Sequence, residues 1–187
     1  FLPLVSVAKC ARVHPDSAWG MIEIKKPDEA QIFYGELNGF PHTFEFRIIG
    51  NTPFKARVSV RPDGNRQTSL ILIKEERRGV SEVSRRSGKR EEWESYATPL
   101  SKMDFTRSGA LEADLDSGVY RLEVSSPDNT GRYHLDIGTG GAALTYWQSV
   151  GFIIAQHKYF GVGTIGALTA PLIYMPLLLT LFVVFGW

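Results

Sequence analysis

The sequence predicts an all-β domain, an antiparallel β-sandwich, followed by an interfacial helix and one C-terminal transmembrane helix. Two observations carry this prediction. Short runs of alternating apolar and polar residues recur before residue 141, and turn-forming residues separate them. All 20 acidic residues and 20 of the 21 Lys and Arg residues also precede residue 141, so that Lys158 is the one charged side chain in the rest of the chain. The net charge of +1 favours neither nucleic acid nor an acidic substrate.

Residues 1–18 are expected to form an apolar, irregular N-terminal arm. Phe1–Ala8 reads FLPLVSVA and resembles the end of an export signal, in which Ser6-Val7-Ala8 resembles a cleavage site. This likeness favours export, and membrane insertion of the arm stays open. The single cysteine, Cys10, cannot form an internal disulfide. Because Lys9 precedes it where a lipidation motif needs a small residue, we expect an unmodified thiol.

Residues 19–140 are expected to form the β-sandwich. Period-two alternation implies strands with one buried and one exposed face, and it assigns His134 to an exposed face. No amphipathic helix of ten residues occurs in this range. The clearest predicted strands are Met21–Ile24, Phe44–Ile48, Ala56–Val60, Val119–Val124 and Tyr133–Ile137. Turns are predicted near residues 37–39, 50–53, 61–65, 116–118 and 127–129.

Four segments between about residues 30 and 138 follow the order of motifs of a known family. They are Ile32–Leu37, Thr43–Phe46, Leu115–Val124 and Asn129–Gly138, and the last two contain Ser-Gly-x-Tyr-x-Leu-x-Val and Thr-Gly-x-Tyr-x-Leu-x-Ile. Together they resemble the bacterial pre-peptidase C-terminal (PPC-type) β-sandwich. The resemblance implies a PPC/jelly-roll-like fold and a non-catalytic module on an exported protein. Some members bind calcium, but no ligand residue of theirs matches a position here.

A charged insert interrupts that pattern. Lys74–Glu94 holds seven basic and six acidic residues, whereas a nucleic-acid surface should carry one sign of charge. We interpret the insert as the solvated tip of a hairpin. The alternative is a docking loop in which Trp93 and Tyr96 anchor a partner, since aromatic residues dominate interface hot spots.

No catalytic, cofactor or metal site is predicted, and the chain is not expected to be an enzyme. The four histidines lack metal-ligand spacing, and no nucleophile elbow, Walker motif or Cys-x-x-Cys occurs. Asp114 and Asp116 are spaced to bind Ca²⁺ from one strand face, although a turn explains them equally well. Gly138–Gly141 has the composition of a phosphate loop without its lysine, so we expect a hinge there.

Residues 141–160 are expected to form a helix at the membrane interface. Leu144, Trp147, Gly151 and Ile154 recur at helical spacing, and tryptophan favours the headgroup level. In the alternative, this segment is a first span and the chain turns back at His157-Lys158, which gives a helical hairpin instead of one span.

Residues 161–187 are expected to form the transmembrane helix. No charged side chain occurs from Tyr159 to Trp187, and 27 residues suffice for a bilayer core of about 30 Å. Pro171 and Pro176 are tolerated in such a helix. Two small-xxx-small pairs, which allow close approach of a partner helix, are Gly163 with Ala167 and Gly166 with Ala170.

These features predict a non-catalytic accessory subunit of an integral membrane protein complex. Its partners are integral membrane subunits and the lipid bilayer, and its β-domain is periplasmic on a bacterial inner membrane. The residues predicted to bind partners are Trp93, Tyr96, Trp147, Gly163, Gly166, Ala167 and Ala170. The alternative is a membrane-anchored periplasmic or cell-surface binding module for a protein, peptide or glycan.

Overall fold

The computed structural model describes residues 9–12, 20–88, 93–98, 100–139, 145–161 and 163–185. The chain divides into two compact units. The first, called here the sandwich unit, consists of residues 6–96 and 105–142. The second, the helical unit, consists of residues 1–5, 97–104 and 143–187. Each unit is described by itself.

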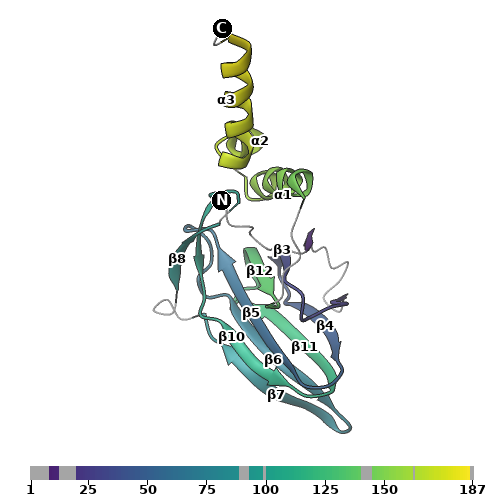
Figure 1. Cartoon of the computed structure of the whole chain (residues 1–187). Helices are drawn as coiled ribbons and strands as arrows, with labels where there is room; N and C mark the ends of the chain where they lie inside the picture. The colour runs from purple at the N-terminus through teal and green to yellow at the C-terminus, as the bar shows by residue number, and fades with distance from the viewer. Residues whose placement is uncertain are drawn as a thin grey trace. The chain divides into compact units, whose positions relative to one another are not determined.

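Two sheets form the sandwich unit, and their strands appear as the long arrows in Figure 1. One sheet has the order β1-β3-β12-β5-β9-β8, with β10 also paired to β5, and the other has the order β2-β4-β11-β6-β7. Strand β1 runs parallel to β3 and β2 runs parallel to β4, whereas the pairs among β3, β4, β5, β6, β7, β9, β10, β11 and β12 are antiparallel. The strands are β1 (Lys9–Arg12), β2 (Met21–Glu23), β3 (Gln31–Asn38), β4 (His42–Ile48), β5 (Thr52–Val60), β6 (Ser69–Glu76), β7 (Gly79–Arg86), β8 (Glu94–Ala97), β9 (Asp104–Arg107), β10 (Leu111–Leu115), β11 (Gly118–Ser125) and β12 (Thr130–Ile137).

Alternate side chains of both sheets meet in one hydrophobic core. Phe44 and Leu122 of one sheet and Val58 and Leu135 of the other are fully or almost fully buried in it. Phe33 and Phe44 pack edge to face across the two sheets, with ring centroids 5.2 Å apart. The predicted β-sandwich is therefore confirmed, and each of the five clearest predicted strands overlaps an observed one.

One polar contact lies inside this apolar core. His42 of β4 and Tyr133 of β12 are both buried, and the His42 Nδ1 atom lies 2.7 Å from the Tyr133 hydroxyl. Gly35 of β3 faces the same ring. A Cβ atom at position 35 would lie 2.8 Å from the Tyr133 hydroxyl oxygen, so only glycine leaves room for the tyrosine. The hydrogen bond thus joins the two sheets at one defined point.

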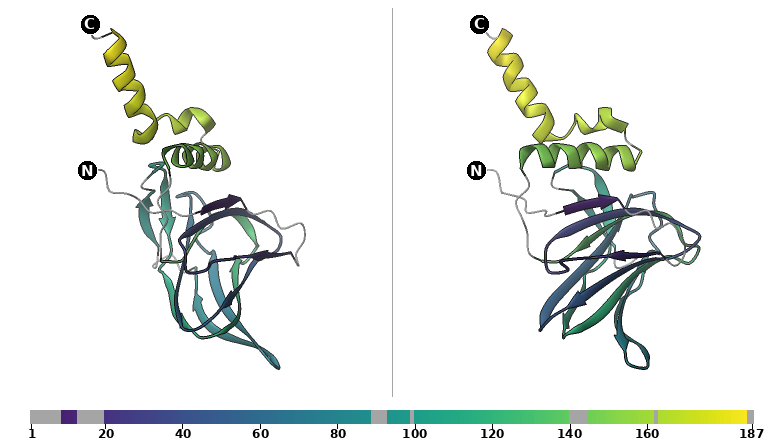
Figure 2. Two further views of the ribbon diagram at one scale, coloured as in Figure 1. Left: turned by 45° about the vertical axis from the view of Figure 1, so that its right-hand side comes forward. Right: turned by 90° about the vertical axis from the view of Figure 1, so that its right-hand side faces the viewer.

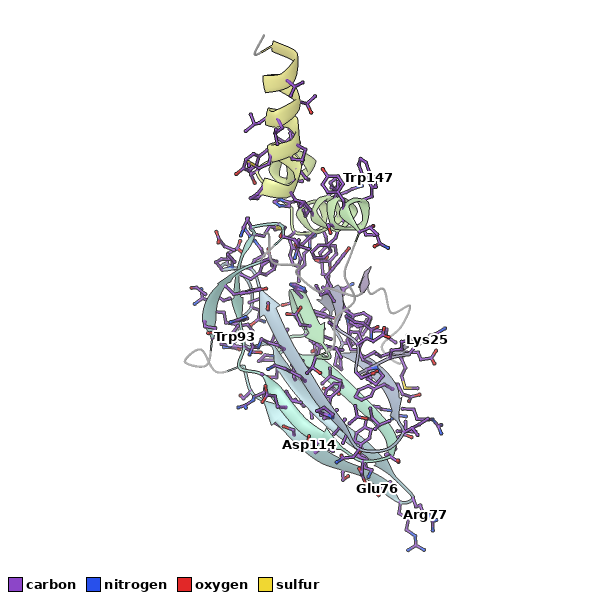
Figure 3. The ribbon with its side chains drawn as sticks, viewed as in Figure 1. Lys25, Glu76, Arg77, Trp93, Asp114 and Trp147 are labelled. Atoms are coloured by element: carbon purple, nitrogen blue, oxygen red, sulfur yellow. The ribbon has the colours of Figure 1, made fainter. Side chains whose placement is uncertain are left out.

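Three expectations about this unit change. Residues 9–12, expected to be irregular, form β1, because the outer edge of β3 offers backbone groups to an extended segment; residues 1–8 and 13–19 lie outside the described residues. The charged insert begins as the β6–β7 hairpin, and Figure 3 shows Arg77 at its tip. His134 does face outward from its sheet, yet it is buried because Phe105 covers it at 5.5 Å between ring centroids.

The helical unit contains α1 (Tyr146–Tyr159), α2 (Gly163–Ala167) and α3 (Pro171–Phe185). Helix α1 lies within the range 141–160 that was expected to be helical. Thr145 caps its first turn, with Gln148 returning a bond to the Thr145 backbone N–H in a capping box. The helix ends at Tyr159, and Gly161, two residues later, has a φ of 81°, which glycine adopts at little cost. Figure 2 shows α3 extending beyond α1 and α2 within this unit.

The single continuous helix predicted over residues 161–187 is not observed. The segment divides into α2 and α3, and residues 168–170 between them form turns with bonds to carbonyls three residues back. Pro171 is the cause, because proline disfavours a helical residue before it and is suited to the first turn of a new helix. In the described part of the chain, no helix combines the length and the apolar character needed to cross a membrane.

Candidate partner-binding surface

Helix α1 has two contrasting faces. Trp147, Gly151, Ile154 and Lys158, spaced three or four residues apart, are all exposed. Trp147 is 78% exposed, and Figure 3 shows it projecting from the helix. Of the aromatic anchors expected from the sequence, Trp147 is therefore the one that the structure leaves available.

The opposite face of α1 carries polar side chains into the interior of the helical unit. Gln156 is fully buried, and its Oε1 atom accepts a hydrogen bond of 2.5 Å from the Ser101 hydroxyl. His157 is also buried, with its Nε2 atom 3.1 Å from the Ser101 carbonyl oxygen. The Ser101 hydroxyl lies 2.5 Å from that of Thr98. These bonds attach the segment 97–104 to α1 through directional polar contacts.

Sequence analysis did not identify this polar cluster. Gln156 and His157 do stand out as polar residues in an apolar stretch, and that was a usable signal. Ser101 gave no signal, because 55 residues separate it from Gln156 and only the fold brings them together.

Small residues pack α2 against α1. Ala167 and Ala170 are buried, and they form an apolar cluster with Ile153 of α1. Two of the small residues assigned to a partner helix are thus already in contact inside the unit. Gly163 is exposed and Gly166 is half-buried. That a partner helix packs on this face stays a prediction.

The start of α3 is held by a tyrosine. Pro176 lies inside α3 and has no N–H to bond the carbonyl oxygen of Leu172, four residues earlier. The hydroxyl of Tyr146 donates to that carbonyl oxygen at 3.2 Å. The Tyr146 hydroxyl thus supplies a donor in place of the N–H that the proline lacks.

Beyond this point α3 exposes apolar side chains. Met175, Leu178, Leu179 and Val183 are each at least half exposed, and Leu179 reaches 61%. Ile165 of α2 is also exposed. Monomeric proteins rarely leave contiguous apolar surface in water, and such surface marks contact with another protein or with lipid. The exposed side chains of α3, with Trp147 and Ile154 of α1, form the candidate partner-binding surface.

The two aromatic residues predicted as anchors at the charged insert, Trp93 and Tyr96, are half-buried, and their binding to a partner stays a prediction. Trp93 is half-buried and packs against the sandwich core. Tyr96 is half-buried too, with the Arg107 guanidinium carbon 4.4 Å from its ring centroid. Burial raises the pKa of the Tyr96 hydroxyl, ahead of a smaller effect from Asp136. Both residues therefore belong to the structure of the sandwich unit.

Asp114 and Asp116, considered above as calcium ligands, do not form a metal site together. Both carboxylate oxygens of Asp116 lie 2.7 Å from the Lys74 ammonium, and the Tyr120 hydroxyl donates to Oδ1 at 2.5 Å. These bonds, the one from Lys74 first, lower the pKa of Asp116. Within the described residues, no three His, Cys, Asp or Glu side chains gather as metal ligands.

Two solved structures are similar to this chain. The pre-peptidase C-terminal domain of collagenase from Bacillus anthracis is 16% identical and matches with a TM-score of 0.40 over 63% of this chain and 93% of that domain. Aeromonas hydrophila PliG, a periplasmic lysozyme inhibitor of g-type lysozyme, is 9% identical with a TM-score of 0.41, over 63% of this chain and 96% of the inhibitor. No family model and no curated protein matches the sequence. Because these identities and TM-scores are low, the function proposed below is argued from the surfaces of this chain alone.

Proposed function

We propose that the chain is a non-catalytic accessory subunit of an integral membrane protein complex. The helical unit is held among apolar helices of the partner subunits, and the sandwich unit lies on the periplasmic side of a bacterial inner membrane. The observation that carries this proposal is the exposed apolar surface of α3, formed by Met175, Leu178, Leu179 and Val183.

The composition of α3 supports an apolar environment. Its fifteen residues include no charged side chain, and Thr180 turns its hydroxyl back to the carbonyl oxygen of Pro176 at 2.8 Å. A helix that is apolar on every side is typical of the interior of a large protein or a membrane. Each exposed leucine gains about 1.5–3 kcal/mol when it is fully buried, so that several together favour association strongly.

Helix α1 supports a position at the level of the lipid headgroups. Its exposed stripe begins with Trp147 and ends with Lys158. Tryptophan is enriched at this level, and a lysine side chain reaches from an apolar surface to the phosphates. In this arrangement the bilayer interface is a second contact beside the partner helices.

Purification of the full chain in mild detergent, from the bacterium that produces it, tests the proposal. An affinity tag inserted between Arg77 and Arg78, at the exposed tip of the β6–β7 hairpin, avoids both ends of the chain. We expect membrane proteins to co-purify in fixed stoichiometry. A monodisperse monomer that carries only a soluble ligand would contradict the proposal.

A matched pair of variants locates the contact. Leu178→Asn with Leu179→Asn should release the partners, because two polar amides then face apolar helices. Ile49→Asn is the control, since Ile49 is 87% exposed on the sandwich unit, outside the proposed contact. Equal loss of partners in both variants would argue against α3 as the contact.

A further inference from the structure

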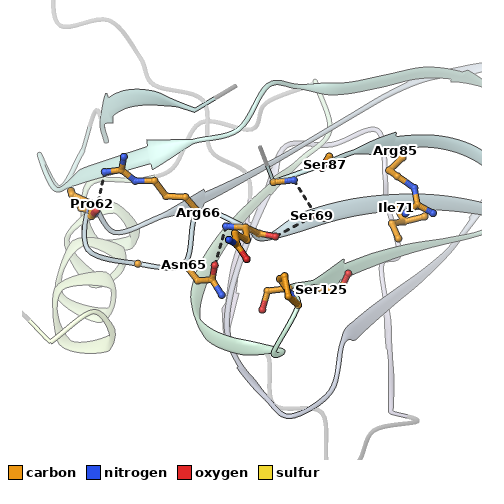
Figure 4. A pocket seen from close by; sticks show the side chains of 13 residues that line it. Pro62, Asn65, Arg66, Ser69, Ile71, Arg85, Ser87 and Ser125 are labelled. Carbon is orange, nitrogen blue, oxygen red and sulfur yellow. Dashed lines mark hydrogen bonds between the residues drawn. The ribbon is translucent and has the colours of Figure 1, made fainter. Parts of the chain in front are cut away.

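A groove of about 940 Å³, lined in large part by serines, arginines and amides, lies on the sandwich unit (Figure 4). One wall is the loop between β5 and β6, which contributes Asn65 and Arg66. The floor and the other wall come from β6, β7 and the end of β11. This volume lies in the range of small-ligand sites, and its open form suits a chain-like ligand.

The floor is formed by three neighbouring strands of one sheet. Ser69 of β6 pairs with Ser125 of β11, and Ile71 of β6 pairs with Arg85 of β7. Paired residues point to the same side of a sheet, as do residues two apart on one strand. These four side chains therefore face the groove together.

Hydrogen bonds brace one wall. The Asn65 Oδ1 atom accepts the Gln67 backbone N–H at 2.9 Å, while Asn65 Nδ2 donates to Asp128 Oδ1 at 3.1 Å. Asp128 also accepts bonds from Thr130 and Ser126, which lower the pKa of its carboxyl in that order of size. Two loops distant in sequence are thus fixed to each other, so the wall exists before any ligand arrives.

A glycine fits the other end of the groove closely. A Cβ atom on Gly88 would lie 2.3 Å from the Gln67 carbonyl carbon, a distance that no other residue type tolerates. The Gly88 backbone N–H donates to the Ser69 hydroxyl at 3.0 Å. The junction between β7 and the loop is therefore held by direct contact.

The groove presents cationic and hydroxyl groups and no carboxylate among its lining residues. Arg66 donates to the Pro62 carbonyl oxygen at 2.9 Å, and no ion pair involves Arg66 within the described residues. Arg85 is held on one side by Glu82, with bonds of 3.1 and 2.6 Å. The lining serines and amides, Ser69, Ser125 and Gln67 among them, both donate and accept hydrogen bonds.

We propose that this groove binds an acidic oligosaccharide, with a uronate carboxylate on Arg66 and sugar hydroxyls on the serines and amides. Guanidinium groups match carboxylates in a two-bond fork, and hydroxyl-rich ligands need partners that both donate and accept. An acidic peptide fits less well, because the floor consists of strand faces, whereas strand addition uses the backbone groups of a sheet edge. The site is independent of the membrane contact proposed above.

Calorimetric titration of the full chain in detergent with tetragalacturonate tests this site. We expect saturable binding that weakens as salt is added, and no binding of the neutral tetrasaccharide maltotetraose. Arg66→Gln should reduce the affinity about 10- to 100-fold, the effect of losing a charge-assisted pair. Arg132→Gln is the matched control, because Arg132 pairs with Glu36 on the other sheet, and its affinity should equal that of the unchanged chain.

A second variant keeps the charges and blocks the space. Ser125→Leu places a bulky side chain on the groove floor and should abolish binding. Thermal unfolding of Arg66→Gln and Ser125→Leu verifies that both variants fold. The proposal is overturned if tetragalacturonate does not bind, if Arg66→Gln and Arg132→Gln weaken it equally, or if tetraglutamate binds more tightly than the saccharide.

Discussion

The two units of this chain distribute polar and apolar side chains in opposite ways. The sandwich unit buries an almost wholly apolar core and pairs many of its surface charges, as Arg121 does with Glu45 and Glu75. The helical unit buries Gln156 and His157, and it exposes Leu179 and Trp147. The sandwich unit also buries polar side chains, as at His42 and His134, but in the helical unit the exposed apolar side chains gather on one helix, α3.

This difference indicates which interactions stabilise each unit. Apolar burial against water holds the sandwich together, and it is non-directional. In the helical unit, directional hydrogen bonds join the segments, while much of the apolar surface remains available to other molecules. The outer surface of the second unit is thus the better guide to partners, and the interior of the first is the better guide to folding.

The largest expected effect comes from truncating one apolar side chain in each unit and comparing the changes in the free energy of unfolding. Phe44→Ala should lower the free energy of unfolding of the sandwich by about 3–5 kcal/mol, because Phe44 is fully buried between the sheets. Leu179→Ala should change it by less than about 0.5 kcal/mol. Urea unfolding followed by tryptophan fluorescence measures both. A comparable loss in the two variants would mean that α3 contributes to the sandwich core.

A smaller effect should follow from removing the hydroxyl at the centre of the polar cluster. Ser101→Ala leaves the buried Gln156 amide without that donor, at a cost of about 1–3 kcal/mol. Hydrogen exchange should quicken over residues 97–104 and α1, with the exchange of β11 unchanged. Ser87→Ala is the control, since Ser87 is exposed on the other unit. Unaltered exchange in Ser101→Ala would show that apolar packing alone holds the segment.

The next effect concerns the proline in α3. Tyr146→Phe removes the hydroxyl that donates to the Leu172 carbonyl oxygen, and should cost about 1 kcal/mol. Exchange should rise at the start of α3. Replacing Pro176 by alanine in the same chain restores a backbone donor for that carbonyl, so the loss should disappear in the double variant. Persistence of the loss would assign another role to Tyr146.

The smallest effect is a pH dependence in the sandwich unit. The folded pKa of Asp116 lies below its ordinary value of 3.8, so its contribution is present above about pH 4 and is lost as the pH falls through the folded pKa. Asp116→Asn should therefore be less stable than the unchanged chain at pH 7, and the difference should shrink towards pH 2. Thermal unfolding across this range measures it. A constant difference would exclude the ionised carboxylate as the cause.

The sequence predicted the sandwich better than the helical unit for a physical reason. Apolar and polar residues alternate along β4, β11 and β12, and this alternation indicates which side chains of each strand face the core. The uniform apolar stretch after Tyr159 contains no such period, and it did not locate the break that Pro171 introduces. Hydropathy averaged over a long window cannot resolve a turn of three residues.

The candidate sites were predicted less completely. Trp147, predicted to bind a partner, is exposed on its helix, and its partner binding stays a prediction. The packing of Trp93 against the sandwich core and of Tyr96 against Arg107 was not predicted, because these contacts join residues that are distant in sequence. The groove was not predicted at all, since its lining comes from three separate segments of the chain. Surfaces assembled from distant segments leave no local pattern in the sequence.

The hydrogen bond between His42 and Tyr133 constrains how this sandwich can change over time. Apolar packing between two stacked sheets is non-directional, so it defines their relative position less sharply than a hydrogen bond does. The 2.7 Å hydrogen bond between His42 and Tyr133 is directional, and Gly35 leaves room for the Tyr133 ring. Together they fix the position of β4 relative to β12. We therefore expect substitutions at His42, Tyr133 and Gly35 to be tolerated only when the three positions change together.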